Sequence, residues 1–232
     1  MRLRRYQSEY IGSLVKWLSI YRPVVQEFKD LVECLNPQFV QDLCSGSGIP
    51  AIYMQEHVAT IPNSILSDKF PDLKFSPTLK INYLKTPVDV LQLDPQPGVV
   101  YSMYNALHHF TDDEKLMLII KMRNKKNGFL FAEILQPDLL TMIKVIFSST
   151  LLQLLTAAFV KPFSLSRLFF TYIIPVNIIT VLYDGIISVM KARSSKQYAT
   201  LLNELSSAGY NISVGKCGSW KATIVFIKGM PA

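Results

Sequence analysis

Two glycines and a carboxylate stand at spacings that suit the binding of a small organic cofactor. Gly46 and Gly48 lie in the turn 45–48, between an apolar run and a segment with helical periodicity. Without side chains they let a ligand approach the backbone, and the N–H groups that open the next helix can meet an anion. Asp68 follows 20 positions after Gly48, at the end of a second apolar run. A carboxylate at that place could accept hydrogen bonds from two ribose hydroxyls.

The same turn admits other interpretations. Residues 46–51 fit the G-x-G-x-x-G/A pattern of dinucleotide-binding proteins, so a nicotinamide-dependent reductase using NAD(P) is one alternative. A tight strand-to-helix turn without a ligand is another, because many α/β proteins contain one.

Two adjacent histidines and an isolated glutamate are candidates for acceptor chemistry. His108 and His109 must point in different directions, and we expect His108 to be the exposed, catalytic one and His109 to pack structurally. Glu133 lies inside an apolar run, where a buried charge needs a partner or a shifted pKa. We expect Glu133 to face the acceptor together with His108, the alternative being a charge at the solvent end of a strand.

The elements that must position these residues alternate between strand and helix. Apolar residues at helical spacing predict two N-terminal helices within 6–35, divided by Pro23. Thr111 and Glu114 have the spacing of a capping box that opens a helix to about Met122. Strands are predicted at 39–44, 63–67, 81–90, 99–103 and 129–134, and a helix starts at Ile49.

The C-terminal part predicts a helix and a strand pair. A helix over 195–208 ends at Gly209, and strands 210–216 and 223–228 are joined through Gly218-Ser219, so this pair is antiparallel. The fold class is α/β: a Rossmann-like, doubly wound, mostly parallel sheet with an antiparallel C-terminal strand and a helical insertion after strand 5. We divide the chain into N-terminal helices and cofactor-binding core (1–136), apolar cap insertion (137–190) and the end of the core (191–232).

Asp42 lies four residues before Gly46 and extends the glycine turn into a longer motif. Asp42-Leu43-Cys44-Ser45-Gly46-Ser47-Gly48 resembles motif I of class I S-adenosylmethionine-dependent methyltransferases, D/E-x-G-x-G-x-G, with Cys44 in place of the first glycine. Three further stretches resemble that superfamily in order: 65–68, 88–90 and 104–110 (Tyr-Asn-Ala-Leu-His-His-Phe). With the apolar insertion, the combination resembles a little-characterised bacterial branch.

This resemblance implies a methyl transfer from S-adenosylmethionine to a small acceptor by in-line displacement, without a metal. Positioning supplies much of the acceleration in such a step, and a base is needed only if the acceptor must lose a proton. The resemblance implies a cofactor site made of Asp42, Cys44, Ser45, Gly46, Ser47, Gly48, Asp68, Lys69, Asp89, Val90, Tyr104 and Asn105.

The insertion is unusually apolar. Residues 145–183 hold two of the 41 charged residues, Lys161 and Arg167, and two uncharged runs of 16 residues. Spanning a bilayer takes about 20 residues. We therefore expect a helical hairpin over the carboxyl edge of the sheet that lines a pocket for a lipophilic acceptor or rests in a membrane interface. A transmembrane hairpin and a homodimer contact are the alternatives.

The composition limits which partners and which cellular compartment we expect for the protein. The net charge is +7, but the basic residues form no basic helix or aromatic ribbon, so we expect no nucleic-acid partner. Three cysteines without a CxxC pattern favour a reducing, cytoplasmic setting, with contact to the inner face of the membrane left open, and no signal peptide is expected. A non-enzymatic, membrane-associated protein on a methyltransferase scaffold is a third functional class.

Overall fold

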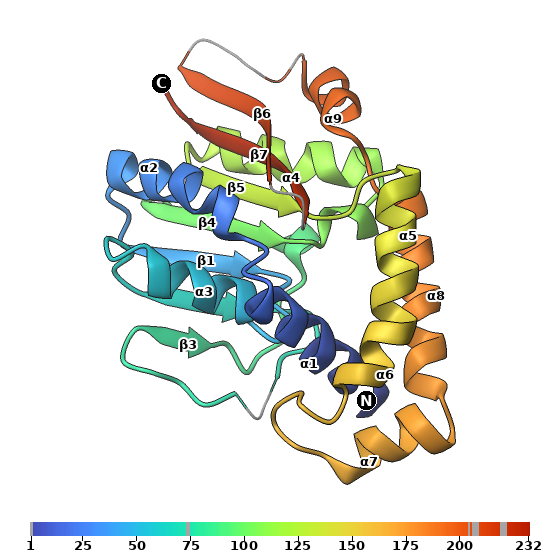
Figure 1. Cartoon of the computed structure of the whole chain (residues 1–232). Coiled ribbons are helices and arrows are strands. Elements are labelled where there is room, and N and C mark those ends of the chain that lie inside the picture. Colours follow the sequence, from blue (N-terminus) through green and yellow to red (C-terminus); the bar gives the residue numbers. More distant parts are fainter. Residues whose placement is uncertain (1, 73–74, 204, 206–208, 219–221) are drawn as a thin grey trace.

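Seven strands form one sheet in the order β3-β2-β1-β4-β5-β7-β6 (Figure 1). The computed structural model describes residues 2–72, 75–203, 205, 209–218 and 222–232. Strands β1 to β5 are parallel, β7 runs antiparallel to β5, and β6 runs antiparallel to β7. The predicted fold class is confirmed. The strands are β1 Phe39–Leu43, β2 Ser64–Ser67, β3 Ile81–Tyr83, β4 Val99–Tyr104, β5 Gly128–Glu133, β6 Tyr210–Gly218 and β7 Thr223–Pro231.

Helices cover both faces of the sheet. Helix α2 (Val25–Leu35), preceded by the short turn η1 (Arg22–Val24), and helix α3 (Ile49–His57) pack on the face that contains Val100 and Leu130. Helices α4 (Asp112–Asn124) and α9 (Ser195–Leu202) pack on the face that contains Tyr101 and Phe131. Every residue of β4 and β5 is buried, which explains why these strands read as continuous apolar runs.

Local signals placed most element boundaries within two residues, whereas two elements are much shorter than expected. The capping box at Thr111 and Glu114 is present. The strand expected over 81–90 ends at Tyr83, because it is an edge strand beside the four-residue β2 and Pro87 has no N–H to continue the ladder. The helix expected over 195–208 ends at Leu202. Residues 206–208 of that prediction, and Ser219 of the predicted β6–β7 connection, lie outside the described residues.

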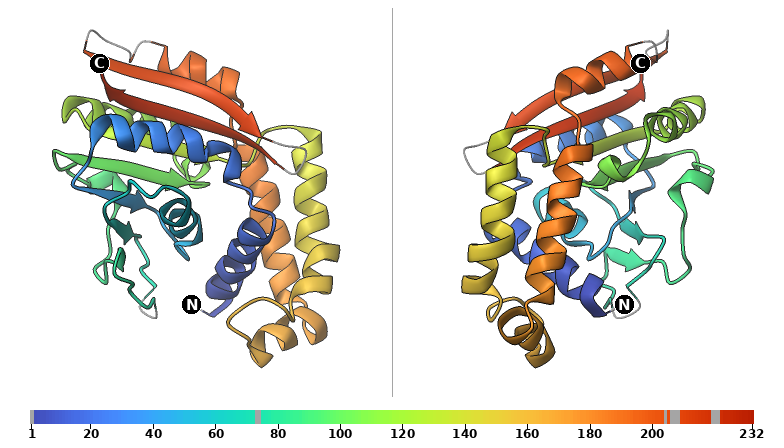
Figure 2. Two further views of the ribbon diagram at one scale, coloured as in Figure 1. Left: turned by 60° about the vertical axis from the view of Figure 1, so that its left-hand side comes forward. Right: turned by 90° about the vertical axis from the view of Figure 1, so that its right-hand side faces the viewer.

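The insertion after β5 forms two antiparallel helical arms beyond the carboxyl ends of the parallel strands (Figures 1 and 2). The first arm is one helix over Leu139–Thr156, made of α5 (Leu139–Phe147), the π-helical turn η4 (Ser148–Leu152) and α6 (Gln153–Thr156). The second arm contains α7 (Leu165–Leu168), the π-helical turn η5 (Phe169–Ile173) and α8 (Val176–Lys191), and it bends by 78° between Ile173 and Val176.

Helix α1 (Arg2–Trp17) lies between this hairpin and the core (Figure 1). Tyr10 of α1 packs with Val160 and Val181 of the insertion in a small apolar cluster. On its other side α1 meets the start of α3 at Gly12, where an added Cβ would lie 2.3 Å from the Cδ1 atom of Ile49. The close approach at Gly12 therefore holds α1 directly over the glycine turn.

Candidate active site

The turn after β1 is built from left-handed backbone. Cys44, Gly46 and Gly48 have φ values of +54°, +52° and +71°, which curl the chain around the end of the strand before α3 begins at Ile49. A Cβ at Gly48 would lie 2.5 Å from Cδ1 of Leu66. The predicted glycine turn is confirmed. Cys44 stands where the motif that it resembles has its first glycine. Its backbone is left-handed, a conformation that glycine adopts easily and that other residues adopt rarely.

Asp68 lies beside this turn at the end of β2. Its carboxylate accepts hydrogen bonds from the backbone N–H of Gly46 at 2.9 Å and of Phe70 at 2.8 Å. The residue is 5% exposed, and Arg4 of α1 reaches its Oδ1 atom at 3.4 Å. Two of the sequence-predicted groups, the turn and the strand-end carboxylate, are thus brought into direct contact.

Asp42 lies inside the sheet, one strand away from Asp68. Its Oδ1 atom accepts a hydrogen bond from the Ser102 hydroxyl at 2.7 Å, and its side chain is buried. Burial raises the pKa of Asp42 to about 7, against the hydrogen bonds from Ser45 and Ser102, which lower it. The backbone oxygen of Asp42 accepts from the Ser45 hydroxyl at 2.9 Å, so the residue also shapes the turn.

Lys69 and Asp89 form an ion pair at 2.8 Å that joins the segment after β2 to the segment after β3. Asp89 also accepts from the backbone N–H of Leu91 and so caps the short helix η2 (Val90–Gln92). The Lys69 hydrogen bond is the main cause that lowers the pKa of Asp89. Val90 is buried behind this pair. These residues occupy the same edge as Asp68.

Tyr104 and Asn105 close the end of β4. Asn105 has a φ of +53°, donates its backbone N–H to Ala132 at 2.7 Å, and accepts at its side-chain oxygen from the N–H of Ile134 at 3.3 Å. The buried Tyr104 ring meets Tyr21 edge-on, with centroids 5.0 Å apart. Together they fix the chain where it leaves the sheet toward the two histidines.

His108 and Glu133 form a buried pair at the end of β5. The Nδ1 atom of His108 lies 2.8 Å from Oε2 of Glu133, and the backbone N–H of Leu107 donates to Oε1 at 2.7 Å. Both side chains are 2% exposed. The prediction that His108 is the exposed histidine is wrong: His109 is exposed, because the carboxylate of Glu133 holds His108 inside. Glu133 does not lie at the solvent end of its strand.

The pairing with Glu133 determines the tautomer of His108. An ionised carboxylate only accepts hydrogen bonds, so the proton of a neutral His108 sits on Nδ1 and Nε2 carries the free electron pair. Nε2 is therefore the ring nitrogen that this pairing leaves as a hydrogen-bond acceptor.

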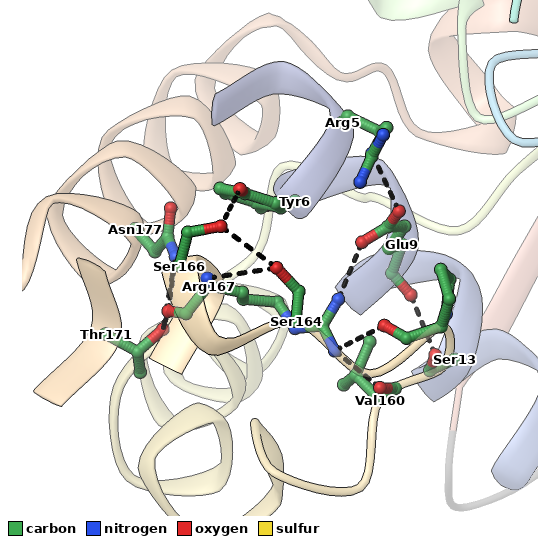
Figure 3. A network of polar contacts seen from close by, with 11 residues as sticks. Arg5, Tyr6, Glu9, Ser13, Val160, Ser164, Ser166, Arg167, Thr171 and Asn177 are labelled. Carbon is green, nitrogen blue, oxygen red and sulfur yellow. Dashed lines mark hydrogen bonds and ion pairs between the residues drawn. The ribbon is translucent and has the colours of Figure 1, made fainter. Parts of the chain in front are cut away.

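A second buried polar network was not foreseen from the sequence. Arg167, which is 2% exposed, donates to Glu9 of α1 at 2.6 Å and to the backbone oxygen of Pro162 at 2.9 Å (Figure 3). Tyr6 and Ser166 add a hydroxyl contact at 2.6 Å. A single arginine in an apolar run indicates a buried charge with a partner, but the sequence does not identify that partner, because Glu9 lies 158 positions away. The network fastens the insertion to α1.

Comparisons with known proteins place the fold. No family model matches the sequence, and a search of curated proteins finds no match. Among solved structures, human N-acetylserotonin methyltransferase in complex with SAM aligns with a TM-score of 0.52 and 16% identity over 90% of this chain. PigF with SAH aligns with a TM-score of 0.53 and 10% identity over 95% of this chain. The chain covers 52% and 57% of those two chains. Its seven-stranded mixed sheet is methyltransferase-like in fold.

Proposed function

We propose that the chain binds S-adenosylmethionine and transfers its methyl group to a small, lipophilic acceptor. The observation that carries the proposal is the contact between the left-handed turn at Gly46 and the strand-end carboxylate of Asp68, 2.9 Å long, in a methyltransferase fold. Both similar structures were solved with the methyl donor or its demethylated product.

The residues at the carboxyl edge fit this cofactor. Asp68 offers carboxylate oxygens to the ribose hydroxyls, and Asp89 with Val90 lies where the adenine would rest. Asp42, Tyr104 and Asn105 would lie beneath the cofactor, and Lys69 would lie at the outer border of its site. When bound, the cofactor supplies an electrophilic methyl group on sulfur. The backbone from Cys44 through Ser45, Gly46 and Ser47 to Gly48 approaches it without large side chains. The Arg4 contact to Asp68 is long and more than half of the Arg4 side chain is exposed, so it does not block the site.

The acceptor would meet His108 beneath the cap. For a hydroxyl acceptor, Nε2 of His108 takes the proton as the oxygen attacks, and Glu133 holds the imidazole and balances its positive charge. Helix α8 packs against the turn η3 (Leu107–His109), which places the insertion next to this base. Exclusion of water by the insertion would strengthen the charge interactions around the base.

The strand order argues against the reductase alternative. Dinucleotide-binding folds have the order 3-2-1-4-5-6 with all strands parallel, whereas β7 here is inserted antiparallel between β5 and β6. A binding measurement distinguishes the proposed enzyme from a non-enzymatic scaffold protein, because a scaffold protein should bind neither S-adenosylmethionine nor NAD(P).

Calorimetric titration with S-adenosylhomocysteine and, separately, with NADPH tests the proposal. We expect binding of S-adenosylhomocysteine alone, and at least about tenfold weaker binding by Asp68→Ala, since a hydrogen bond to a charged group contributes about 1.5–3 kcal/mol. Asp68→Asn can keep the contact to Gly46 and should fold while losing affinity. Asp94→Asn, at the opposite edge in the segment that precedes β4, is the matched control. Binding of NADPH alone, or of neither compound, would refute the proposal.

A further inference from the structure

The insertion carries most of the exposed apolar surface of the molecule. Among the described residues, 24 large apolar side chains are exposed, and 18 of them lie between Leu139 and Met190. Single exposed apolar side chains are ordinary, but a continuous face of this kind marks an interaction site.

The exposed side chains follow one stripe on each arm. On the first arm, Leu139, Ile143, Phe147, Leu151 and Leu155 recur at a spacing of four residues and are 49–75% exposed. On the second arm, Ile179, Tyr183 and Met190 are 61–70% exposed. Helical periodicity puts each set on one side of its helix. The two arms lie side by side (Figure 2), and α5 contacts α8. We call the two exposed stripes together the outer face.

The buried side of the insertion is more polar than apolar: beside the buried Ala157, Val160, Val181 and Val189 it contains six buried polar or charged residues. Ser149, Gln153, Thr171, Asn177 and Ser188 are each at most 4% exposed. A helix on a water-soluble protein shows the opposite pattern, with apolar residues inward and polar residues outward. Helices in contact with lipid turn their polar residues toward the protein interior.

Part of this polar interior is hydrogen-bonded within the protein, while the side-chain oxygens of Gln153 and Asn177 and the Nε atom of Arg167 are buried without a hydrogen-bond partner among the described residues. Asn177 donates to the backbone oxygen of Arg167 and to the hydroxyl of Thr171, each at 3.1 Å, and Arg167 is paired with Glu9 (Figure 3). The inverted polarity is therefore an ordered arrangement in which the apolar side chains are directed outward.

The charged residues near the outer face indicate which kind of partner contacts it. Residues 139–191 contain four basic side chains and one carboxylate, Asp184, in a chain of net charge +7. Lys161 is exposed between Phe159 and Phe163, which are 71% and 63% exposed. Lys191 is exposed beside Met190. Apolar contact with flanking cations suits anionic lipid headgroups. In a two-fold dimer the same patch meets itself, so these lysines would repel one another.

We propose that the outer face rests in the headgroup and acyl boundary of an anionic membrane, with both arms in the plane of the bilayer. The inner side of the hairpin is occupied by α1 and η3, so the arms cannot be surrounded by lipid. The first arm is 18 residues long with a mean hydropathy of 1.6 and 11% of its window buried, so its length and composition alone also allow a span. Its contacts with α8 and the hydrogen bond from Tyr10 of α1 to the backbone oxygen of Ser148 favour the in-plane position. The second arm is bent by 78°.

The inference stands apart from the proposed methyl transfer, because binding of vesicles needs no cofactor. Co-sedimentation of the purified chain with vesicles of phosphatidylcholine plus phosphatidylglycerol, compared with pure phosphatidylcholine, measures it. We expect binding to both, stronger to the anionic vesicles, with Lys161→Gln plus Lys191→Gln removing the difference.

A pair of matched variants separates the outer face from apolar surface in general. Leu155→Gln plus Ile179→Gln should weaken vesicle binding about tenfold or more, since each side chain buries apolar surface in the membrane. The control is Leu79→Gln plus Met117→Gln, exposed side chains outside the insertion, which should bind like wild type. All four sites are exposed, so circular dichroism should show unchanged folding.

Two outcomes would overturn the inference. One is equal vesicle binding by the outer-face pair and its control. The other is a stable dimer in light scattering that does not bind vesicles and that the outer-face pair converts to a monomer.

Discussion

Three buried carboxylates at the carboxyl edge of the sheet differ in their hydrogen-bond partners. Asp42 faces the hydroxyl of Ser102, Asp68 faces two backbone N–H groups, and Glu133 faces an imidazole and one N–H. Backbone donors favour an ionised carboxylate, whereas a hydroxyl inside the sheet compensates burial less. The three groups should therefore respond differently to substitution.

Asp42 should make the fold less stable as pH rises. Its pKa is raised to about 7 in the folded state, above about 4 in an unfolded chain, so the unfolded chain ionises first. The contribution of Asp42 is full below about pH 4 and is lost up to about pH 7. Asp42→Asn should remove this loss, at about 1.4 kcal/mol per unit of pKa difference.

Urea denaturation of wild type and Asp42→Asn at about pH 4 and about pH 8 measures this difference, because the other titrating groups cancel between the two proteins. The stability of the variant relative to wild type should rise by a few kcal/mol between the two pH values. A relative stability that is constant across the range would show that Asp42 is ionised in the fold.

Glu133→Gln should reduce turnover without weakening cofactor binding. The glutamine amide can donate to Nδ1 of His108, which moves the imidazole proton to Nε2 and removes the base. We expect kcat to fall by about 10²-fold or more, the usual range for a general base, with an unchanged affinity for S-adenosylhomocysteine. His109→Gln, at the exposed neighbour, is the control and should retain most activity. Parallel loss of cofactor affinity would indicate a structural role for Glu133 instead.

At this scale the sequence was sufficient where the partners are local. The turn at Gly46 was predicted from the spacing within residues 42–48, and the strand-end position of Asp68 from the apolar run that precedes it. The two histidines were assigned the wrong way round. Adjacency shows only that their rings differ in direction, and Glu133, which selects His108, lies 25 positions away.

Among the elements, the strand-to-helix turn depends most on single positions. Gly48→Ala should lower the free energy of unfolding by about 2 kcal/mol or more, because a left-handed alanine costs about 1 kcal/mol and its Cβ would meet Leu66 at 2.5 Å. Gly209→Ala is the matched control, since Gly209 has a φ of +91° and open space around it. Equal effects in thermal denaturation would mean that contact with Leu66 contributes nothing.

The attachment of the insertion to α1 should behave as a buried ion pair. Glu9→Gln leaves the guanidinium of Arg167 without its counter-charge, and breaking such pairs costs about 3–5 kcal/mol. Glu33→Gln removes the exposed Lys29–Glu33 pair, 3.8 Å long, and should cost less than about 1 kcal/mol. Chemical denaturation compares the two. A small effect of Glu9→Gln would show that the carbonyl contacts of Arg167 suffice.

Helices and strands were predicted well where periodicity and caps agree. Thr111 and Glu114 define the start of α4, and the apolar runs of β4 and β5 define central strands. The third strand was overestimated because its length is set by β2, its single neighbour, which local sequence does not specify.

For the whole molecule, the composition located the apolar insertion but not its orientation. Two uncharged runs are compatible with a buried hairpin, a dimer contact or a lipid contact. The decisive observation is which side Ser149, Gln153 and Asn177 occupy, and that depends on how both arms pack against α1 and the turn at His108.

Vesicle binding should be sensitive to salt without disappearing. Near 1 M salt the Debye length is about 3 Å, so attraction between the basic chain and anionic lipid is screened while apolar contact persists. Binding to anionic vesicles should fall with salt to the level found with neutral vesicles. Complete release of the protein at high salt would show that the outer face makes no apolar contact with the membrane.

Helix α1 meets three parts of the molecule within nine residues: Asp68 through Arg4, Arg167 through Glu9, and the start of α3 through Gly12. Free-energy coupling between two ligands is reciprocal. If cofactor binding shifts α1 and thereby strengthens or weakens the proposed membrane contact of the hairpin, membrane binding must strengthen or weaken cofactor binding by the same free energy. The affinity for S-adenosylhomocysteine measured with and without vesicles, and the affinity for vesicles measured with and without S-adenosylhomocysteine, must therefore differ by the same factor.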